Sequence, residues 1–206
     1  MMPERPTNFI LHNCALDELE AIRKYFPGCE IDDRYSSDAI KLFNPTTKEH
    51  DLNAEIVEFE LVENGVSYIQ HGSEILRIIC AEGEKRSDVL IFMILWISGC
   101  NLLEVDYADI ISMTEGKKTL IYHSISADAT SFADNTSNFL KALLPDIRNL
   151  LCGIITSDIS LIDLGDMMNH YEDIVLSASL EAQWGWIVLD GPRTMETNRF
   201  IVFTWN

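Results

Sequence analysis

Apolar positions recur along this chain with two different periods, and the periods predict its secondary structure. Leu16, Leu19 and Ile22 recur at helical spacing and predict a helix over residues 15–26, which Pro27 ends. Short apolar runs bounded by polar or turn residues predict strands over residues 8–11, 56–62, 66–69, 119–126, 150–156, 184–189 and 200–205.

The remaining pattern in the first half is less regular. Asn64-Gly65 predicts a tight turn that joins two of these strands in a hairpin. The short apolar run of residues 73–81 predicts a helix. Residues 32–53 are rich in turn-forming residues and predict surface loops around a short strand.

Four helices are predicted in the second half. Ser87 is a helix cap residue, and the nine apolar residues of Val89 to Ile97 predict a helix buried on every face. A second helix is predicted to start near Asp106, and a third, over residues 128–144, ends at Pro145. Ser160 starts a fourth, with Asp163 at the capping-box position. Alternating helices and strands predict an α/β layered fold with a mixed β-sheet packed by helices.

Composition narrows the functional classes. The 206 residues include 33 Asp and Glu against 15 Lys and Arg, a formal charge of −18. Nucleic-acid binding and basic membrane-surface helices both depend on clustered positive charge. The excess of acidic residues therefore argues against both functions. The longest apolar run has nine residues, whereas a membrane-spanning helix needs about 20.

Cysteine usage and the amino terminus point to a reduced, cytoplasmic compartment. The five cysteines are an odd number, widely spaced, and form no C-x-x-C pair, so neither a disulfide framework nor a zinc site is predicted. Residues 1–8 have no basic stretch leading into an apolar one, as a secretory signal would.

From residue 87 onward, the element order and its junctions resemble the FtsZ/tubulin family of filament-forming GTPases. Ser87-Asp88-Val89-Leu90 looks like the start of the family's long central helix. The segment 103–110, which contains V-D-Y-A-D-I, is similar to the loop after that helix, where bacterial members read N-x-D-F-A-D-V. Residues 151–161 and 186–190 resemble the strands and helix that follow. The resemblance covers residues 87–206.

The resemblance implies a domain organisation and a set of site residues. Residues 87–206 correspond to the central helix and C-terminal domain, and residues 1–86 form a short α+β segment in place of the nucleotide domain. Asp106 and Asp109 occupy the positions of the two loop aspartates, which in the family reach the nucleotide of the next subunit. Asp88 occupies a position near the guanine in bacterial members.

Two departures from the family affect the expected activity. The glycine-rich G-G-G-T-G-T-G phosphate loop is absent from residues 1–86, and no Walker-type loop replaces it. Without such a loop, no row of free backbone amides cradles a triphosphate. Glu104 also stands where the family has an uncharged Asn, which adds a negative charge. The sequence therefore favours a pseudo-GTPase without cofactor, and GTP with Mg²⁺ is the alternative.

Structural roles also account for these acids. Asp106 and Asp109 match the N-cap and third position of a helix. Carboxylates there accept hydrogen bonds from backbone N–H groups that have no partner within the helix. Asp88 is a common first-turn acid.

Three functional hypotheses follow from the sequence. The first is a non-catalytic protein of cell division that binds an FtsZ-like filament, or a second copy of itself, through Glu104, Asp106 and Asp109. The second is a reduced GTPase that is active only on self-association. In the third, the chain is an unrelated small acidic binding or immunity-type protein whose charge steers it to a basic partner.

Overall fold

The computed structural model describes residues 7–26, 30–32, 39–43, 55–70, 72–97, 119–147, 149–157, 159–178, 186–190 and 197–205. The chain divides into two compact units, Met1–Cys100 with Lys118–Leu120, and Asn101–Lys117 with Ile121–Asn206. Each unit has β-strands packed by helices, and parallel and antiparallel pairs both occur. The predicted α/β class with a mixed sheet is confirmed.

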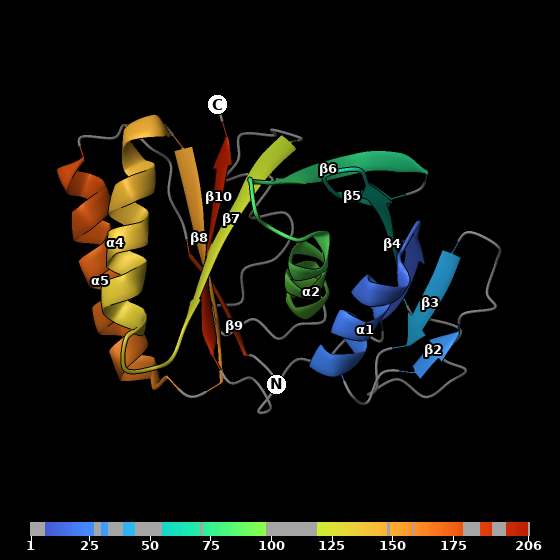
Figure 1. Cartoon of the computed structure of the whole chain (residues 1–206), viewed down its shortest axis with the longest axis horizontal. Coiled ribbons are helices and arrows are strands. Elements are labelled where there is room, and N and C mark those ends of the chain that lie inside the picture. Colours follow the sequence, from blue (N-terminus) through green and yellow to red (C-terminus); the bar gives the residue numbers. More distant parts are fainter. Residues whose placement is uncertain are drawn as a thin grey trace. The chain divides into compact units, whose positions relative to one another are not determined.

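The first unit has six strands and two helices among its described residues. Its elements are β1 (Thr7–His12), α1 (Leu16–Tyr25), β2 (Glu30–Asp32), β3 (Ala39–Phe43), β4 (Glu55–Val62), β5 (Gly65–Gln70), β6 (Ser73–Cys80) and α2 (Arg86–Ile97). The strand order is β2-β3-β1-β4-β5-β6, in which β1 and β4 are parallel and the other described pairs are antiparallel (Figure 1).

The core of the first unit lies on the sheet face that alternate residues of β1, β4 and β5 share. Phe9 stacks on Phe59 with ring centroids 6.1 Å apart, and Phe59 packs against Tyr68 on the next strand. Because side chains alternate between faces along a strand, this cross-strand row fixes the register of all three strands. The helices α1 and α2 pack against each other, and α2 also packs on β5 and β6.

Helix α2 has no polar face. Every residue from Val89 to Trp96 is at most 5 % exposed. This confirms the prediction that the apolar run is buried on every side. An all-round apolar helix is stable in water only when its whole circumference is covered, so α2 is a core element of the fold.

The predicted helix over residues 73–81 is wrong, because this segment is strand β6. Leu76, Ile78 and Cys80 are buried, and their period of two is the pattern of a strand. The segment pairs with β5 in an antiparallel hairpin, so pairing with a neighbouring strand outweighed local helical preference. The one hairpin that the sequence predicted, β4 with β5 around Asn64-Gly65, is confirmed.

Strand β3 is the short strand expected within residues 32–53, and β2 was not predicted. The loops expected in residues 33–38 and 44–53 lie outside the described residues.

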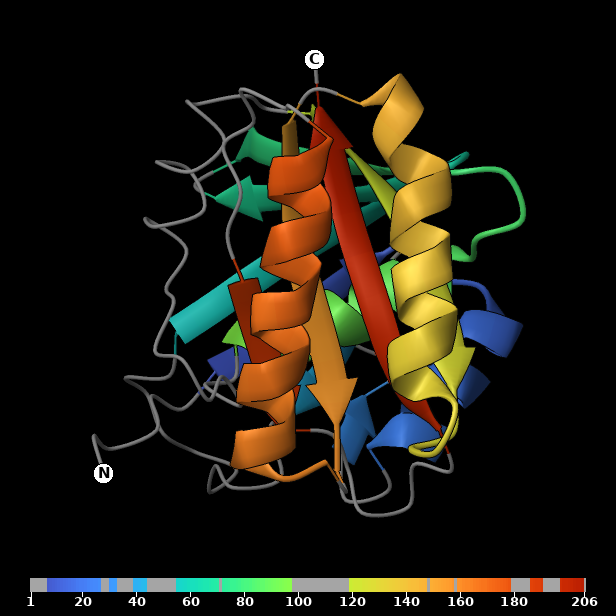
Figure 2. The ribbon, with the colours of Figure 1, turned by 90° about the vertical axis from the view of Figure 1, so that its left-hand side faces the viewer.

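The second unit has four strands and two long helices among its described residues. Its elements are β7 (Thr119–Ala127), α4 (Phe132–Leu143), the 3₁₀ turn η1 (Leu144–Asp146), β8 (Asn149–Thr156), α5 (Leu161–Ser177), β9 (Trp186–Asp190) and β10 (Asn198–Trp205). The strand order is β7-β10-β8-β9, with β10 antiparallel to β7 and β8, and β8 parallel to β9. Helices α4 and α5 lie side by side on one face of these strands (Figures 1 and 2).

Aromatic and hydroxyl side chains join this helical layer to its sheet. Phe200 of β10 contacts Tyr171 of α5 and Phe139 of α4, with ring centroids 5.1 and 6.4 Å away. The buried hydroxyls of Thr136 and Tyr171 hydrogen bond between the two helices. These contacts fix α4 and α5 against the sheet on their inner faces and leave their outer faces to solvent.

Candidate functional site

The four site residues predicted from the sequence have different outcomes. Asp88 lies in the first turn of α2, where its backbone N–H donates to the Lys85 carbonyl oxygen at 3.1 Å. Its side chain is half-buried. Glu104, Asp106 and Asp109 lie outside the described residues.

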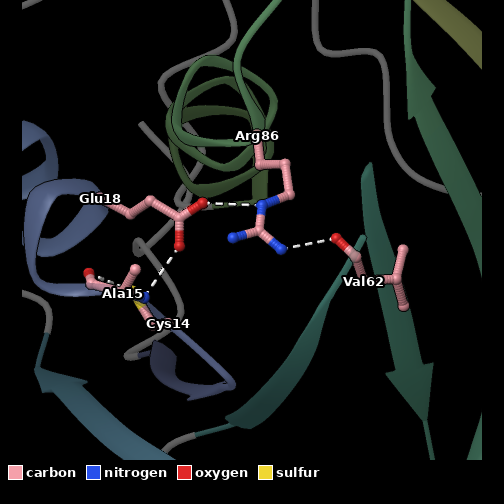
Figure 3. Close-up of polar contacts among 5 residues, drawn as sticks. All are labelled: Cys14, Ala15, Glu18, Val62 and Arg86. Carbon is pink, nitrogen blue, oxygen red and sulfur yellow. Dashed lines mark hydrogen bonds and ion pairs between the residues drawn. The ribbon is translucent and has the colours of Figure 1, made fainter. Parts of the chain in front are cut away.

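An ion pair between the buried Glu18 and the partly exposed Arg86 joins the starts of α1 and α2 within the first unit (Figure 3). The Arg86 Nε–H donates to Glu18 Oε1 at 2.8 Å, and its Nη1 donates to the Val62 carbonyl oxygen at 2.6 Å. Glu18 Oε2 accepts the backbone N–H of Ala15 at 2.8 Å. Glu18 is 7 % exposed, so these partners, rather than water, stabilise its negative charge.

Local sequence explains each half of this pair. Glu18 is the third residue of α1, where a carboxylate returns to the backbone N–H of the preceding cap residue. Arg86 is the first residue of α2, and Val62, whose carbonyl oxygen it reaches, is the last residue of β4. The ion pair ties three elements together: the β1–α1 connection, the start of α2 and the last residue of β4.

Burial and nearby charged side chains shift the pKa of two cysteine thiols. Burial raises the pKa of Cys14 to about 11, and the Glu18 carboxylate adds to the shift while Arg86 opposes it. Burial likewise raises the pKa of Cys80 to about 11, and the Glu84 carboxylate is the next cause. Both thiols are therefore protonated at neutral pH and are poor nucleophiles, because the thiolate is the reactive form.

This corner is suited to holding elements together. Both Glu18 oxygens accept hydrogen bonds, so the carboxylate has its strongest acceptor positions occupied. A general base needs a carboxylate that a substrate can reach, and Glu18 is 7 % exposed with each of its oxygens already accepting one hydrogen bond. Removing one partner of such a pair leaves an uncompensated buried charge, which costs about 3–5 kcal/mol.

In the second unit, a hydrogen-bonded turn precedes α4 and a side-chain cap starts α5. Asp128 Oδ1 accepts hydrogen bonds from Thr130 Oγ1 and from the backbone and side chain of Ser131, and these bonds lower the pKa of Asp128. Helix α4 begins after this turn at Phe132, four residues later than predicted, and its N-cap Ser131 makes no side-chain cap hydrogen bond. Ser160 Oγ accepts from the Asp163 N–H at 3.1 Å, which confirms the predicted cap of α5.

The outer face of α5 is a second candidate surface. The helix has four carboxylate residues and no Lys or Arg, a formal charge of 0 − 4 = −4. Two large apolar side chains are nevertheless exposed on it, Ile162 at 79 % and Leu176 at 58 %. Exposed apolar and acidic groups thus share one helix. This surface differs from the Glu18–Arg86 pair of the first unit, whose polar groups already have partners within the protein.

Sequence reasoning missed the Glu18–Arg86 pair and the outer face of α5. Glu18 had a local signal, since it stands three residues after the cap of a predicted helix. Its partner is 68 residues away, and no spacing rule connects the two. The exposed face of α5 was implicit in the helical periodicity, because Ile162 and Leu176 lie outside the set of apolar residues that recur at helical spacing, residues 161, 164, 168, 171 and 175.

Two features are absent from the described residues. No helix in this part of the chain is both long and apolar enough to cross a bilayer. Nor does this part gather three or more His, Cys, Asp or Glu side chains in a group that could hold a metal ion.

Comparison with known proteins gives structural neighbours only. No protein-family model and no curated protein sequence matches this chain. Solved structures that resemble it are tubulin-like proteins. The W319Y mutant of FtsZ from M. jannaschii is 16 % identical with a TM-score of 0.43, covering 58 % of this chain and 39 % of that chain.

Two further neighbours have similar statistics. An empty FtsZ dimer from M. jannaschii is 18 % identical with a TM-score of 0.42, covering 57 % of this chain and 37 % of that chain. The GDP-bound monomer of CetZ1 from Haloferax volcanii is 12 % identical with a TM-score of 0.35, covering 60 % and 41 %. This chain thus spans well under two thirds of the length of each of these neighbours.

Proposed function

We propose that this protein acts by binding another protein and does not catalyse a reaction. The observation that carries the proposal is how four charged and thiol groups of the first unit are used. Glu18 and Arg86 spend their charges on each other and on backbone groups, and the thiols of Cys14 and Cys80 are held in the protonated form. Each of these groups contributes to packing and none is poised for acid–base or nucleophilic chemistry.

The net charge of the chain supports the proposal that it binds another protein. A formal charge of −18 on 206 residues gives the protein a negative field, which speeds encounter with a positively charged partner. On α5 this charge is combined with exposed apolar side chains, and a protein partner covers both kinds of group.

As the partner, we propose a filament of an FtsZ-like protein. The support is the sequence resemblance of residues 87–206, which includes the V-D-Y-A-D-I segment with Asp106 and Asp109. A subunit with the family's second domain and without its phosphate loop would add to one filament end and not receive the next subunit. In this proposal Glu104, Asp106 and Asp109 lie at the contact, and Asp88 has a structural role in the first turn of α2.

A polymer pelleting assay tests the proposal. FtsZ is polymerised with GTP, and substoichiometric amounts of the purified protein are added. We expect shorter filaments and less pelleted polymer, and we expect the Asp106→Lys/Asp109→Lys variant to lose this effect.

The catalytic alternative is tested on the isolated protein. We expect no GTP hydrolysis and no thermal shift on addition of GTP and Mg²⁺. Turnover that disappears in the Asp106→Ala variant would establish a GTPase and overturn the non-catalytic proposal.

A further inference from the structure

The outer face of α5 presents one continuous line of exposed side chains. Counting along the helix, Ile162, Asp166, Asn169, Asp173 and Leu176 are all exposed and follow one another at intervals of four, three, four and three residues. We call these five residues the α5 stripe. The opposite face, with Leu164, Tyr171 and Val175, is buried against the sheet.

The spacing of the stripe is that of a helix–helix contact seam. Alternating steps of three and four residues keep side chains in line along a helix, and such a line meets a second helix laid alongside. From Ile162 to Leu176 is 14 residues, or about 21 Å at 1.5 Å per residue. This length matches four turns of a partner helix.

The stripe has apolar ends and an acidic middle. Ile162 is 79 % exposed and Leu176 is 58 % exposed, so each offers most of its side chain to a partner. Asp166 and Asp173 stand between them, and neither makes an ion pair with another residue in the described part of the chain. Helix α5 itself contains no Lys or Arg that could neutralise them.

We propose that the α5 stripe docks an amphipathic helix of a partner protein, in which two basic residues lie between two apolar ones. The apolar residues of that helix cover Ile162 and Leu176, and its basic residues pair with Asp166 and Asp173. This inference rests on the proposed function and adds a second contact surface, besides Glu104, Asp106 and Asp109, and the chemistry of what it binds.

Charge complementarity selects a basic partner over a second copy of this chain. If two α5 stripes met, the carboxylates of one would face the carboxylates of the other, in either direction of the helices. Like charges placed together across an interface weaken it, whereas Arg or Lys at the same positions strengthens it. The four acids of α5 therefore act against self-pairing through this face.

A charge-swap experiment on the full chain tests the inference. The probe is a fluorescently labelled, three-heptad helical peptide with Leu at its two end positions and Arg at the two positions between them. A second peptide has Glu in place of Arg. We expect the wild-type protein to bind the Arg peptide at least tenfold tighter than the Glu peptide by fluorescence anisotropy, with affinity falling as salt is added.

Variants of the stripe separate its charged and apolar parts. In Asp166→Lys/Asp173→Lys the preference should reverse, so that the Glu peptide binds tighter. In Ile162→Ser/Leu176→Ser the affinity for the Arg peptide should fall at least tenfold. Both changes are on the exposed face, and circular dichroism checks that the helix content is kept.

Matched controls come from the first unit. Leu16 at 80 % and Ile56 at 56 % exposure match the two apolar residues of the stripe, and Glu20 and Glu63 are exposed acids. Leu16→Ser/Ile56→Ser and Glu20→Lys/Glu63→Lys should each leave the binding unchanged. The inference would be overturned if the controls lost as much peptide affinity as the stripe variants, or if the charge swap did not reverse the peptide preference. Dimerisation of the wild type that the stripe variants abolish would also overturn it.

The pelleting assay distinguishes failure of this inference from failure of the proposed function. If the stripe variants act on FtsZ filaments as the wild type does and no variant affects peptide binding, the function stands and the stripe is not its surface. If the wild type acts on no filament yet shows the charge-swap result, the stripe stands and the filament partner is wrong.

Discussion

Glu18 and Arg86 are the residues on which the first unit most depends. A carboxylate that is 7 % exposed would be unstable without a cation, and Arg86 supplies both that cation and a hydrogen bond to Val62. The pair thereby fixes where α1, α2 and β4 begin or end.

We expect Arg86→Met to lower the free energy of unfolding by about 3 kcal/mol, because it leaves the Glu18 carboxylate buried without its cation. Urea denaturation measures the change. The double variant Glu18→Gln/Arg86→Met should lose much less than the two single variants together, since the amide of Gln needs no counter-charge. Strictly additive losses would show that the two side chains do not interact.

The thiol of Cys14 gives a pH-dependent prediction. With its pKa raised from 9.0 to about 11, Cys14 has about 100-fold less thiolate at pH 8 than an unperturbed thiol. Iodoacetamide labelling of the native protein should be slower by about this factor and should rise about tenfold per pH unit up to pH 11. Peptide mass spectrometry measures it, with the urea-unfolded chain as the reference.

The same shift has a defined effect on stability. A thiol whose pKa is higher in the folded state than in the unfolded state favours folding while it is protonated in both. That contribution is complete below pH 9 and is lost as the pH rises from 9 to about 11, because the unfolded chain then binds fewer protons. Labelling that is equally fast in native and unfolded chains would contradict the shift.

At the scale of elements, the β4–β5–β6 meander depends on a close approach of two backbones. Gly65 begins β5 and pairs with Ile79, and a Cβ at this position would clash with the Ile78 carbonyl oxygen. The chain therefore needs glycine here for space, in addition to the turn it makes with Asn64.

Gly65→Ala should cost about 2–3 kcal/mol of stability, because the β5–β6 pairing must move to make room for the methyl group. Gly165→Ala is the matched control. Gly165 lies inside α5 with open space around its missing Cβ, so alanine should stabilise the protein by about 0.5–1 kcal/mol through helix propensity. Thermal unfolding of both variants measures the changes, and a neutral Gly65→Ala would contradict the packing argument.

Prediction from the sequence succeeded where a local pattern was strong. The buried helix α2, the capped helix α5 and the hairpin of β4 with β5 follow from runs of a few residues each. It failed at β6, whose short apolar run fits a helix as well as the period of two of a strand, and pairing with β5 selects the strand. That pairing energy comes from a neighbour in space, which a local window of sequence does not contain.

At the scale of the whole molecule, the dominant feature is the net charge of −18. Like charges repel one another over about 10 Å at 0.1 M salt, and the repulsion opposes the folded state. With 33 acids and only 15 Lys and Arg, at least 18 acids have no Lys or Arg to pair with.

We therefore expect added NaCl to stabilise the protein. Screening that recovers about 1 kcal/mol should raise Tm by about 2–4 °C for a chain of this size. Differential scanning calorimetry in low salt and in about 0.3 M NaCl measures the shift, and sucrose at equal osmolality controls for solvent effects. A Tm that falls with salt would mean that exposed ion pairs stabilise the fold more than like charges destabilise it.

The sequence by itself determined the helices, most of the strands, the α/β class and the acidic character of this protein, because these depend on periodicity, caps and composition. Only the tertiary structure decided that residues 73–80 form a strand, that Glu18 meets Arg86, and which residues of α5 remain exposed. The physical reason is that strand pairing, ion pairing and burial are relations between groups far apart in the chain. A local pattern specifies which groups are available, and folding selects their neighbours.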